Sequence, residues 1–114
     1  MEMLIILNDP PYGTERSYNG LRLAKALGNE AVKVTLFLLA DAVICANLGQ
    51  KVPQGFYNME LMLNAVARKG EVLLCGTCMD ARGITDEAIV AGARRSTMKE
   101  LAERTLAADK VVVF

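Results

Sequence analysis

Two cysteines separated by two residues are the side chains of this chain best suited to covalent chemistry. Cys75 ends an apolar run, and Cys78 follows in the segment Cys-Gly-Thr-Cys. A thiol at the end of a strand lies near free backbone N–H groups, whose partial positive charge favours the nucleophilic thiolate. We therefore expect Gly76 and Thr77 to help stabilise an anion at Cys75, and Arg82 to add a full positive charge.

The sequence contains no histidine, so activation of a thiol has to come from charges and backbone dipoles rather than from a Cys–His pair. Asp80 lies nearby in the sequence and would oppose ionisation of Cys75. Three other interpretations stay open: two small buried hydrophobic residues, dithiol redox chemistry of the thioredoxin kind, or half of a zinc site to which only Cys45 could add a sulfur. We expect core packing for Cys45, and we expect no metal or other cofactor.

Alternating apolar and helical patterns predict the elements that position these residues. Four apolar runs indicate buried strands at residues 3–7, 32–39, 72–75 and 111–114. Helices are expected after four capping residues, which are Thr14, Asp41, Asn58 and Thr97, the last in a capping box with Glu100. Residues 84–96 fit either a helix that starts near residue 85 or a short fifth strand at 89–94. We therefore expect an α/β three-layer sandwich with a mostly parallel sheet of four or five strands.

The loops at the carboxyl edge of such a sheet are the candidate surroundings of the cysteine pair, because ligands of parallel sheets bind there. These loops cover residues 8–13, 40–41, 49–57 and 76–83. Asp41 is expected to support the pocket. Tyr12 either forms a wall of the pocket or belongs to a rigid turn, and residues 50–57 form either a lid or a subunit contact.

The composition narrows the class of protein. The chain of 114 residues fits one domain, and its 13 basic and 13 acidic residues give no electrostatic attraction to nucleic acid or to a membrane. No apolar run approaches the roughly 18 residues of a membrane span, and the first residues lack the basic start of a signal peptide. We therefore expect a cytosolic protein whose three cysteines do not form a disulfide framework. The apolar fraction of 53% predicts a subunit interface.

A series of short motifs runs along nearly the whole chain. They stand at residues 11–15 (PYGTE), 21–24 (LRLA), 41–43 (DAV), 49–51 (GQK), 74–84 (LCGTCMDARGI), 101–102 (LA) and 108–114 (ADKVVVF). In this order and spacing they resemble the DsrE/DsrF/TusD family of sulfur-relay proteins, most closely its YchN-like branch. The resemblance implies a flavodoxin-like or Rossmann-like α/β domain that assembles as trimers or hexamers.

The resemblance also implies roles for the two cysteines. Sulfur-carrying members of the family hold sulfane sulfur as a persulfide on a strand-end cysteine, eight residues before the glycine of an Arg-Gly pair. By this spacing the family cysteine corresponds to Cys75, with Gly83 as the glycine, and Cys78 corresponds to a second cysteine of the YchN-like branch. The implied function is a small sulfur carrier or sulfurtransferase-like protein, with sulfur-donor and sulfur-acceptor proteins as partners. Two alternatives are a non-enzymatic ligand-binding or interaction module of the same fold and a Cys-x-x-Cys dithiol redox protein.

Overall fold

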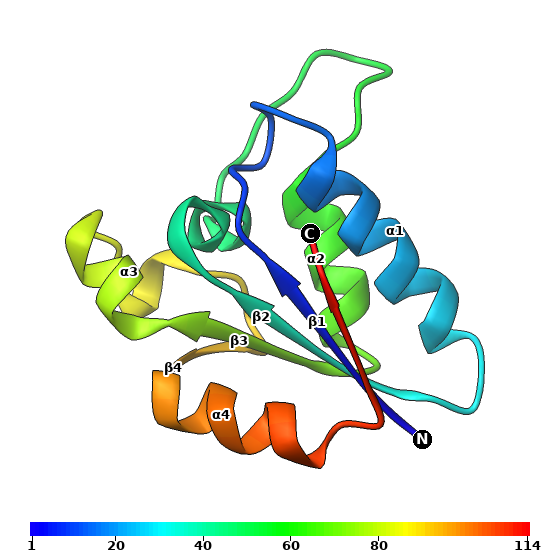
Figure 1. Cartoon of the computed structure of the whole chain (residues 1–114). Helices are drawn as coiled ribbons and strands as arrows, with labels where there is room; N and C mark the ends of the chain where they lie inside the picture. Colours follow the sequence, from blue (N-terminus) through cyan, green and yellow to red (C-terminus); the bar gives the residue numbers. More distant parts are fainter.

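Five parallel strands form the central sheet of the protein. In a computed structural model that describes residues 1–114, they run in the order β4-β3-β2-β1-β5. Their bounds are β1 (Glu2–Leu7), β2 (Lys33–Leu38), β3 (Glu71–Cys75), β4 (Ala93–Ser96) and β5 (Lys110–Val113). Helices α1 (Arg16–Gly28) and α2 (Met59–Ala67) cover one face of the sheet, and α4 (Met98–Ala107) covers the other (Figure 1). The predicted α/β sandwich is therefore confirmed, and helices on both faces explain the nearly continuous apolar runs.

Three short helical segments lie at the ends of strands. They are the 3-10 helix η1 (Ala40–Ala46) after β2, α3 (Gly76–Ala81) directly after β3, and the 3-10 helix η2 (Asp86–Ala88) before β4. In place of the helix expected at residues 42–48 there is a 3-10 helix of seven residues that begins two residues earlier, and no side chain caps it. Asp41 does not act as the predicted cap, because its carboxylate accepts hydrogen bonds from the Arg82 guanidinium at 2.8 and 2.9 Å.

The segment that fitted either a helix or a strand contains mainly a strand. β4 begins at Ala93, later than the alternative at residues 89–94, and follows a turn at Gly92 with a φ of +89°. It pairs only with β3 and forms an edge of the sheet. An edge strand keeps access to solvent, so β4 accommodates the charged side chains of Arg94 and Arg95.

Two of the four predicted side-chain caps are confirmed. The side chain of Asn58 accepts a hydrogen bond from an amide in the first turn of α2 (3.2 Å), and that of Thr97 accepts one from the Glu100 amide (3.1 Å). The predicted cap at Thr14 is wrong, because the residue preceding α1 is Glu15, whose side chain makes no capping hydrogen bond. The Thr14 hydroxyl donates to the Asp9 carboxylate (2.6 Å) and accepts from the Arg16 amide at the start of the helix (3.3 Å). The capping box is half-formed, because the Glu100 carboxylate turns away to bind Arg94 and Ser96.

The central strands form a closely packed core that fixes the carboxyl edge of the sheet. Ile5 of β1, Leu36 and Phe37 of β2, and Leu74 of β3 are all fully buried. Truncating one such leucine to alanine would cost about 2–5 kcal/mol of stability. The ends of β1, β2 and β3 are therefore rigid supports for the segments that follow them. None of the helices combines the length and the apolar character needed to cross a membrane.

Candidate active site around Cys75

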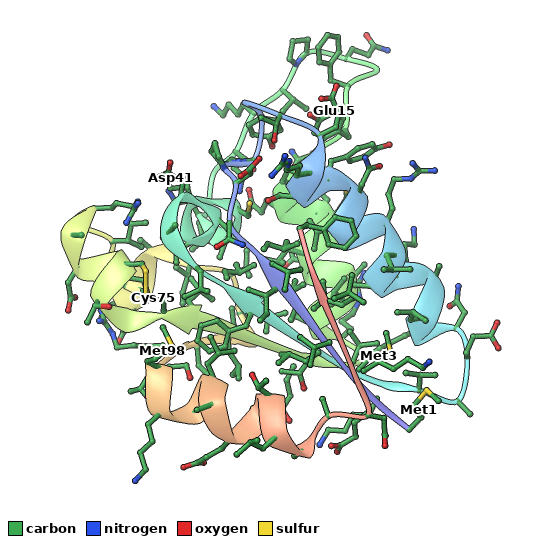
Figure 2. All side chains as sticks on the ribbon, viewed as in Figure 1. Met1, Met3, Glu15, Asp41, Cys75 and Met98 are labelled. Carbon is green, nitrogen blue, oxygen red and sulfur yellow. A yellow bond between two sulfur atoms is a disulfide. The ribbon has the colours of Figure 1, made fainter.

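The segments after β2 and β3 meet at the carboxyl edge of the sheet. Cys75 is the last residue of β3, and the residue beside it in β4 is Ser96. Figure 2 shows Cys75 at this corner, with Asp41 on η1 to one side and Met98 at the start of α4 to the other. The site is thus assembled from η1, α3 and the β4–α4 junction, which are far apart in the sequence.

The Cys75 sulfur lies within a tight group of donors from α3. The Cys78 amide donates to the Cys75 Sγ at 3.3 Å, and the Thr77 hydroxyl lies 3.2 Å from the same sulfur. The structure joins Cys75 and Cys78 as a disulfide, with their Cα atoms 5.2 Å apart. Two of the three cysteines are thus paired, and only Cys45 is a free thiol.

In the reduced pair, the two thiols have opposite acidities. Burial opposes ionisation of Cys75, but hydrogen bonds from the Cys78 thiol, the Thr77 hydroxyl and the amides of both residues outweigh it and lower the pKa of Cys75. Burial raises the pKa of Cys78, and so does the hydrogen bond through which its thiol supports the Cys75 anion. Cys75 is therefore the more readily ionised thiol of the pair, and the thiolate is the nucleophilic form of cysteine.

The amides that act on Cys75 are those of Thr77 and Cys78. They lie one residue later than the expected Gly76 and Thr77 amides. The reason is that Cys75 is itself the residue preceding α3, and its side chain accepts from the first turn in the manner of a helix cap. Gly76 instead packs against β4, where a Cβ on this residue would lie 3.0 Å from the Arg95 Cγ.

Arg82 and Asp41 lie on the side of Cys78. Arg82 donates to the Cys78 carbonyl oxygen at 3.0 Å and pairs with Asp41. Its charge acts on Cys78, where it lowers the pKa and partly offsets the effect of burial, and it is not among the causes that shift Cys75. The pair ties the end of α3 to η1, so its direct role in this structure is to hold the helix.

A strained backbone position also faces Cys78. The Ala40 amide donates to the Cys78 Sγ at 3.3 Å, and Ala40 has a φ of +51°. Left-handed backbone costs an alanine about 1–2 kcal/mol. Strain of this kind persists where the surrounding structure enforces it, often at functional sites.

A cavity of about 290 Å³ opens beside Cys75. Gly76 and Thr77 line one part of it, and the rest is formed mainly by residues that sequence analysis did not assign to the site, namely Arg95, Ser96, Thr97 and Met98. Because one water molecule occupies about 30 Å³ of liquid, the cavity has room for an outer sulfur atom and for the group that delivers it. One indication of these residues was present in the sequence, namely the alternative of a fifth strand at residues 89–94. Pairing of that strand with β3 places the residues at its end beside Cys75.

Tyr12 lies outside this cavity. Its hydroxyl donates to the Gln50 side chain at 2.6 Å and accepts from the Met59 amide at 3.1 Å, and its ring stacks against Tyr57 at 5.8 Å between centroids. None of residues 50–57 lines the cavity either. This region therefore connects the first loop of the chain to α2, and it does not cover Cys75.

Cys45 is confirmed as a core residue. It is fully buried in η1, and its Sγ lies 3.8 Å from the Asp9 carbonyl oxygen. Burial raises the pKa of Cys45 to about 12, although a hydrogen bond with Ser17 opposes the shift. No group of three or more His, Cys, Asp or Glu side chains is placed to hold a metal ion.

The chain matches a known protein family over its whole length. The model of the DsrE/DsrF-like family matches residues 1–114. The chain is 42% identical over 116 residues to protein YchN of Escherichia coli, covering 99% of this chain and 98% of that one. It is 35% identical over 114 residues to an uncharacterized protein of Methanocaldococcus jannaschii, with both chains fully covered.

Solved structures agree with the sequence comparison. The crystal structure of the Escherichia coli ychN protein superimposes with a TM-score of 0.93, covering 99% of this chain and 98% of that chain. A protein of unknown function from Methanobacterium thermoautotrophicum superimposes with a TM-score of 0.71 at 12% identity, covering 99% and 97%. The second similarity is one of fold alone.

Proposed function

Because this chain belongs to the DsrE/DsrF-like family, which is associated with sulfur relay, we propose that it is a sulfur carrier that accepts sulfane sulfur as a persulfide on Cys75. One observation carries the proposal. Cys75 is the thiol that combines a lowered pKa with access to an open cavity. Cys45 is sealed in the core, and the pKa of Cys78 is raised.

Sulfur uptake is a nucleophilic displacement. The Cys75 thiolate attacks the outer sulfur of a donor persulfide, R–S–SH. A new S–S bond forms to Cys75 while the donor S–S bond breaks, and the donor leaves as the thiolate R–S⁻. The outer sulfur keeps its proton or loses it to water, so no external oxidant or reductant is required. An acceptor thiolate takes the sulfur away from Cys75 by the same displacement.

Cys78 supplies a second way to release the sulfur. Its thiol attacks the inner sulfur of the Cys75 persulfide, which releases H₂S and leaves a Cys75–Cys78 disulfide. The Cα separation of 5.2 Å is within the ordinary range for a disulfide, so the step needs no large backbone movement. An external dithiol or two thiols must then reduce the disulfide before the next cycle.

The same disulfide favours one second candidate, a dithiol redox protein. In that case Cys75 and Cys78 exchange with partner disulfides and carry no sulfane sulfur. The two functions differ in what the reduced protein does with a persulfide, since only the carrier retains an additional sulfur atom.

We further propose that the protein works in the cytosol as a homo-oligomer, a trimer or a hexamer, together with sulfur-donor and sulfur-acceptor proteins. The apolar fraction of the chain supports an interface, and nine large hydrophobic side chains remain exposed on one protomer. Light scattering at micromolar concentration tests the assembly, and the mass of a single 12.4 kDa chain would contradict it.

The function is tested by sulfur loading followed by peptide mass mapping. Reduced protein is incubated with inorganic polysulfide, and added sulfur is located on each cysteine peptide in the native chain and in Cys78→Ser. We expect one added sulfur on Cys75 in Cys78→Ser, and in the native chain either that sulfur or the Cys75–Cys78 disulfide left by its release. Cys45→Ser is the matched control and should load normally. Absence of added sulfur on Cys75 in Cys78→Ser, where release through Cys78 is blocked, would favour the redox protein and reject the carrier.

A further inference from the structure

Arg95 of β4 makes two hydrogen bonds to α3 that the proposed function does not use. Its Nη1 donates to the Gly76 carbonyl oxygen at 3.0 Å and to the Asp80 carboxylate at 2.9 Å. Its Nε donates to the Asp86 carboxylate at 2.9 Å. Arg95 thus connects the first turn of α3, a later turn of the same helix, and η2.

The carbonyl that Arg95 holds belongs to the turn that carries the donors to Cys75. Gly76 is followed directly by Thr77 and Cys78, whose hydroxyl and amides act on the Cys75 sulfur. The contact is close, because a Cβ on Gly76 would lie 3.0 Å from the Arg95 Cγ. A shift of Arg95 therefore moves the turn, and hydrogen bonds weaken steeply when their angles change.

The charge of Arg95 does not itself account for the acidity of Cys75. Two carboxylates bind the guanidinium, and their hydrogen bonds raise the pKa of Arg95. Arg95 is not among the groups that shift Cys75. The other charged groups near the pair, Arg82 and Asp41, face Cys78. The influence of Arg95 on Cys75 is thus exerted through the position of α3.

Arg94, the residue before Arg95 in β4, binds a different partner. Arg94 alternates to the other side of β4, where its guanidinium binds the Glu100 carboxylate at 2.6 and 2.9 Å. It does not line the cavity. Arg94 and Arg95 therefore carry the same charge and lie in the same edge strand, but only Arg95 contacts α3.

We propose that Arg95 is the positioning residue of this site: by holding Gly76 and Asp80, and being held by Asp86, it fixes α3 so that the Thr77 and Cys78 donors point at the Cys75 sulfur. Arg95 touches no reacting atom in this role. The inference concerns the bare thiol, so it can be tested whether or not the protein carries sulfur.

The test is the pH dependence of Cys75 alkylation by iodoacetamide in reduced protein. All variants are made in a Cys78→Ser background, which prevents the disulfide and keeps the Cys78 amide. Arg95→Gln should move the alkylation midpoint of Cys75 to higher pH and slow alkylation at pH 6 by about tenfold, the size of one or two weakened hydrogen bonds. Arg95→Lys should restore part of the rate, and the matched control Arg94→Gln should stay within about twofold of the parent.

An equal midpoint for Arg95→Gln and Arg94→Gln, in proteins with the same circular dichroism spectrum, would overturn the proposal. If Arg95→Gln does not fold, Asp86→Asn decides, because it removes the anchor of Arg95 and leaves the arginine in place. A shift in the same direction supports positioning by Arg95, and an unchanged midpoint overturns it. Failure of sulfur loading in Cys78→Ser would reject the proposed function alone, since the alkylation midpoints involve no sulfur donor.

Discussion

Cys45 and Cys75 occupy the same edge of the sheet and have opposite chemistry. Both are buried, with 0% and 5% of their surface exposed. Cys45 lies in η1, which follows β2, and Cys75 is the last residue of β3. Burial raises the pKa of Cys45 to about 12, whereas the pKa of Cys75 is lowered in spite of burial. Depth in the structure therefore does not decide which thiol reacts.

The difference lies in the hydrogen-bond donors. Cys45 lies near the Asp9 carbonyl oxygen, which accepts from a thiol and cannot stabilise a thiolate. Cys75 faces the Thr77 hydroxyl and two backbone amides, which all donate to an anion. At this edge the pKa of a buried cysteine is lowered because the next turn of the chain directs hydrogen-bond donors at its sulfur.

The largest expected effect is the loss of sulfur loading in Cys75→Ser. Serine keeps the shape and the hydrogen bonds but is not ionised at neutral pH, so no persulfide can form at this position. Loading with inorganic polysulfide, measured by the thiocyanate released on cyanolysis, should fall to background. Cys45→Ser should load as the native chain does. A Cys75→Ser protein that still loads would show that Cys75 is not the thiol that accepts sulfur.

Cys45 should make stability fall at high pH. Its pKa is about 12 in the folded protein and about 8.5 to 9 in an unfolded chain, so the unfolded state loses its proton first as the pH rises. The stabilisation is complete below pH 8.5 and is lost progressively up to pH 12. At pH 10 the native chain should lose about 1.4–2 kcal/mol relative to pH 8 that Cys45→Ala does not lose. Urea unfolding of the two reduced proteins measures this difference. If the free energy of unfolding falls equally with pH in both proteins, the pKa of Cys45 is not raised by burial in the folded state.

Thr77→Val should bring Cys75 closer to Cys45 in acidity. Valine keeps the shape of threonine and removes the hydroxyl that lies 3.2 Å from the Cys75 Sγ. The loss of one hydrogen bond to an anion, about 1 kcal/mol, should slow alkylation of Cys75 at pH 6 by about fivefold. Thr77→Ser is the matched control and should remain close to the native rate. An unaffected Thr77→Val protein would mean that the backbone amides alone sustain the thiolate.

The smallest expected effect concerns Ala40, which donates its amide to Cys78. Glycine tolerates the φ of +51° without strain, so Ala40→Gly should stabilise the protein by up to about 1 kcal/mol. Ala26→Gly in the last turn of α1 is the control and should destabilise the protein by up to about 1 kcal/mol. Thermal unfolding of both variants distinguishes these signs. A destabilised Ala40→Gly protein would show that the left-handed backbone is not strained here.

The apolar strands were predictable, and the charged edge strand β4 was not. Continuous apolar runs identify β1, β2 and β3, because strands covered on both faces contain few polar residues. The run at residues 111–114 also marks a strand, but β5 is the other edge of the sheet and is largely exposed, so the expectation that it is buried is wrong. β4 contains Arg94 and Arg95 and only one buried residue, Ser96. A short edge strand of this kind leaves little hydrophobic pattern, so the sequence could not decide between strand and helix in this segment.

The part of the candidate site that is formed by residues close together in the sequence was predictable. The spacing of Cys75, Thr77 and Cys78 in one turn places the donors next to the sulfur, as the structure has them. Arg82 stands four residues after Cys78, which puts both on one side of α3 and explains why its guanidinium reaches the Cys78 carbonyl. The role of Arg95 depends on the register of β4 against β3, and no local pattern encodes that pairing.

The most direct test of the account is the order in which the cysteines of the reduced native chain are alkylated as the pH is raised. Iodoacetamide labelling followed by peptide mass spectrometry gives a midpoint for each cysteine in one sample. The account predicts that Cys75 reacts at the lowest pH, Cys78 at a higher pH, and Cys45 only above about pH 11 or after unfolding. Alkylation of Cys78 or Cys45 at a lower pH than Cys75 would contradict it.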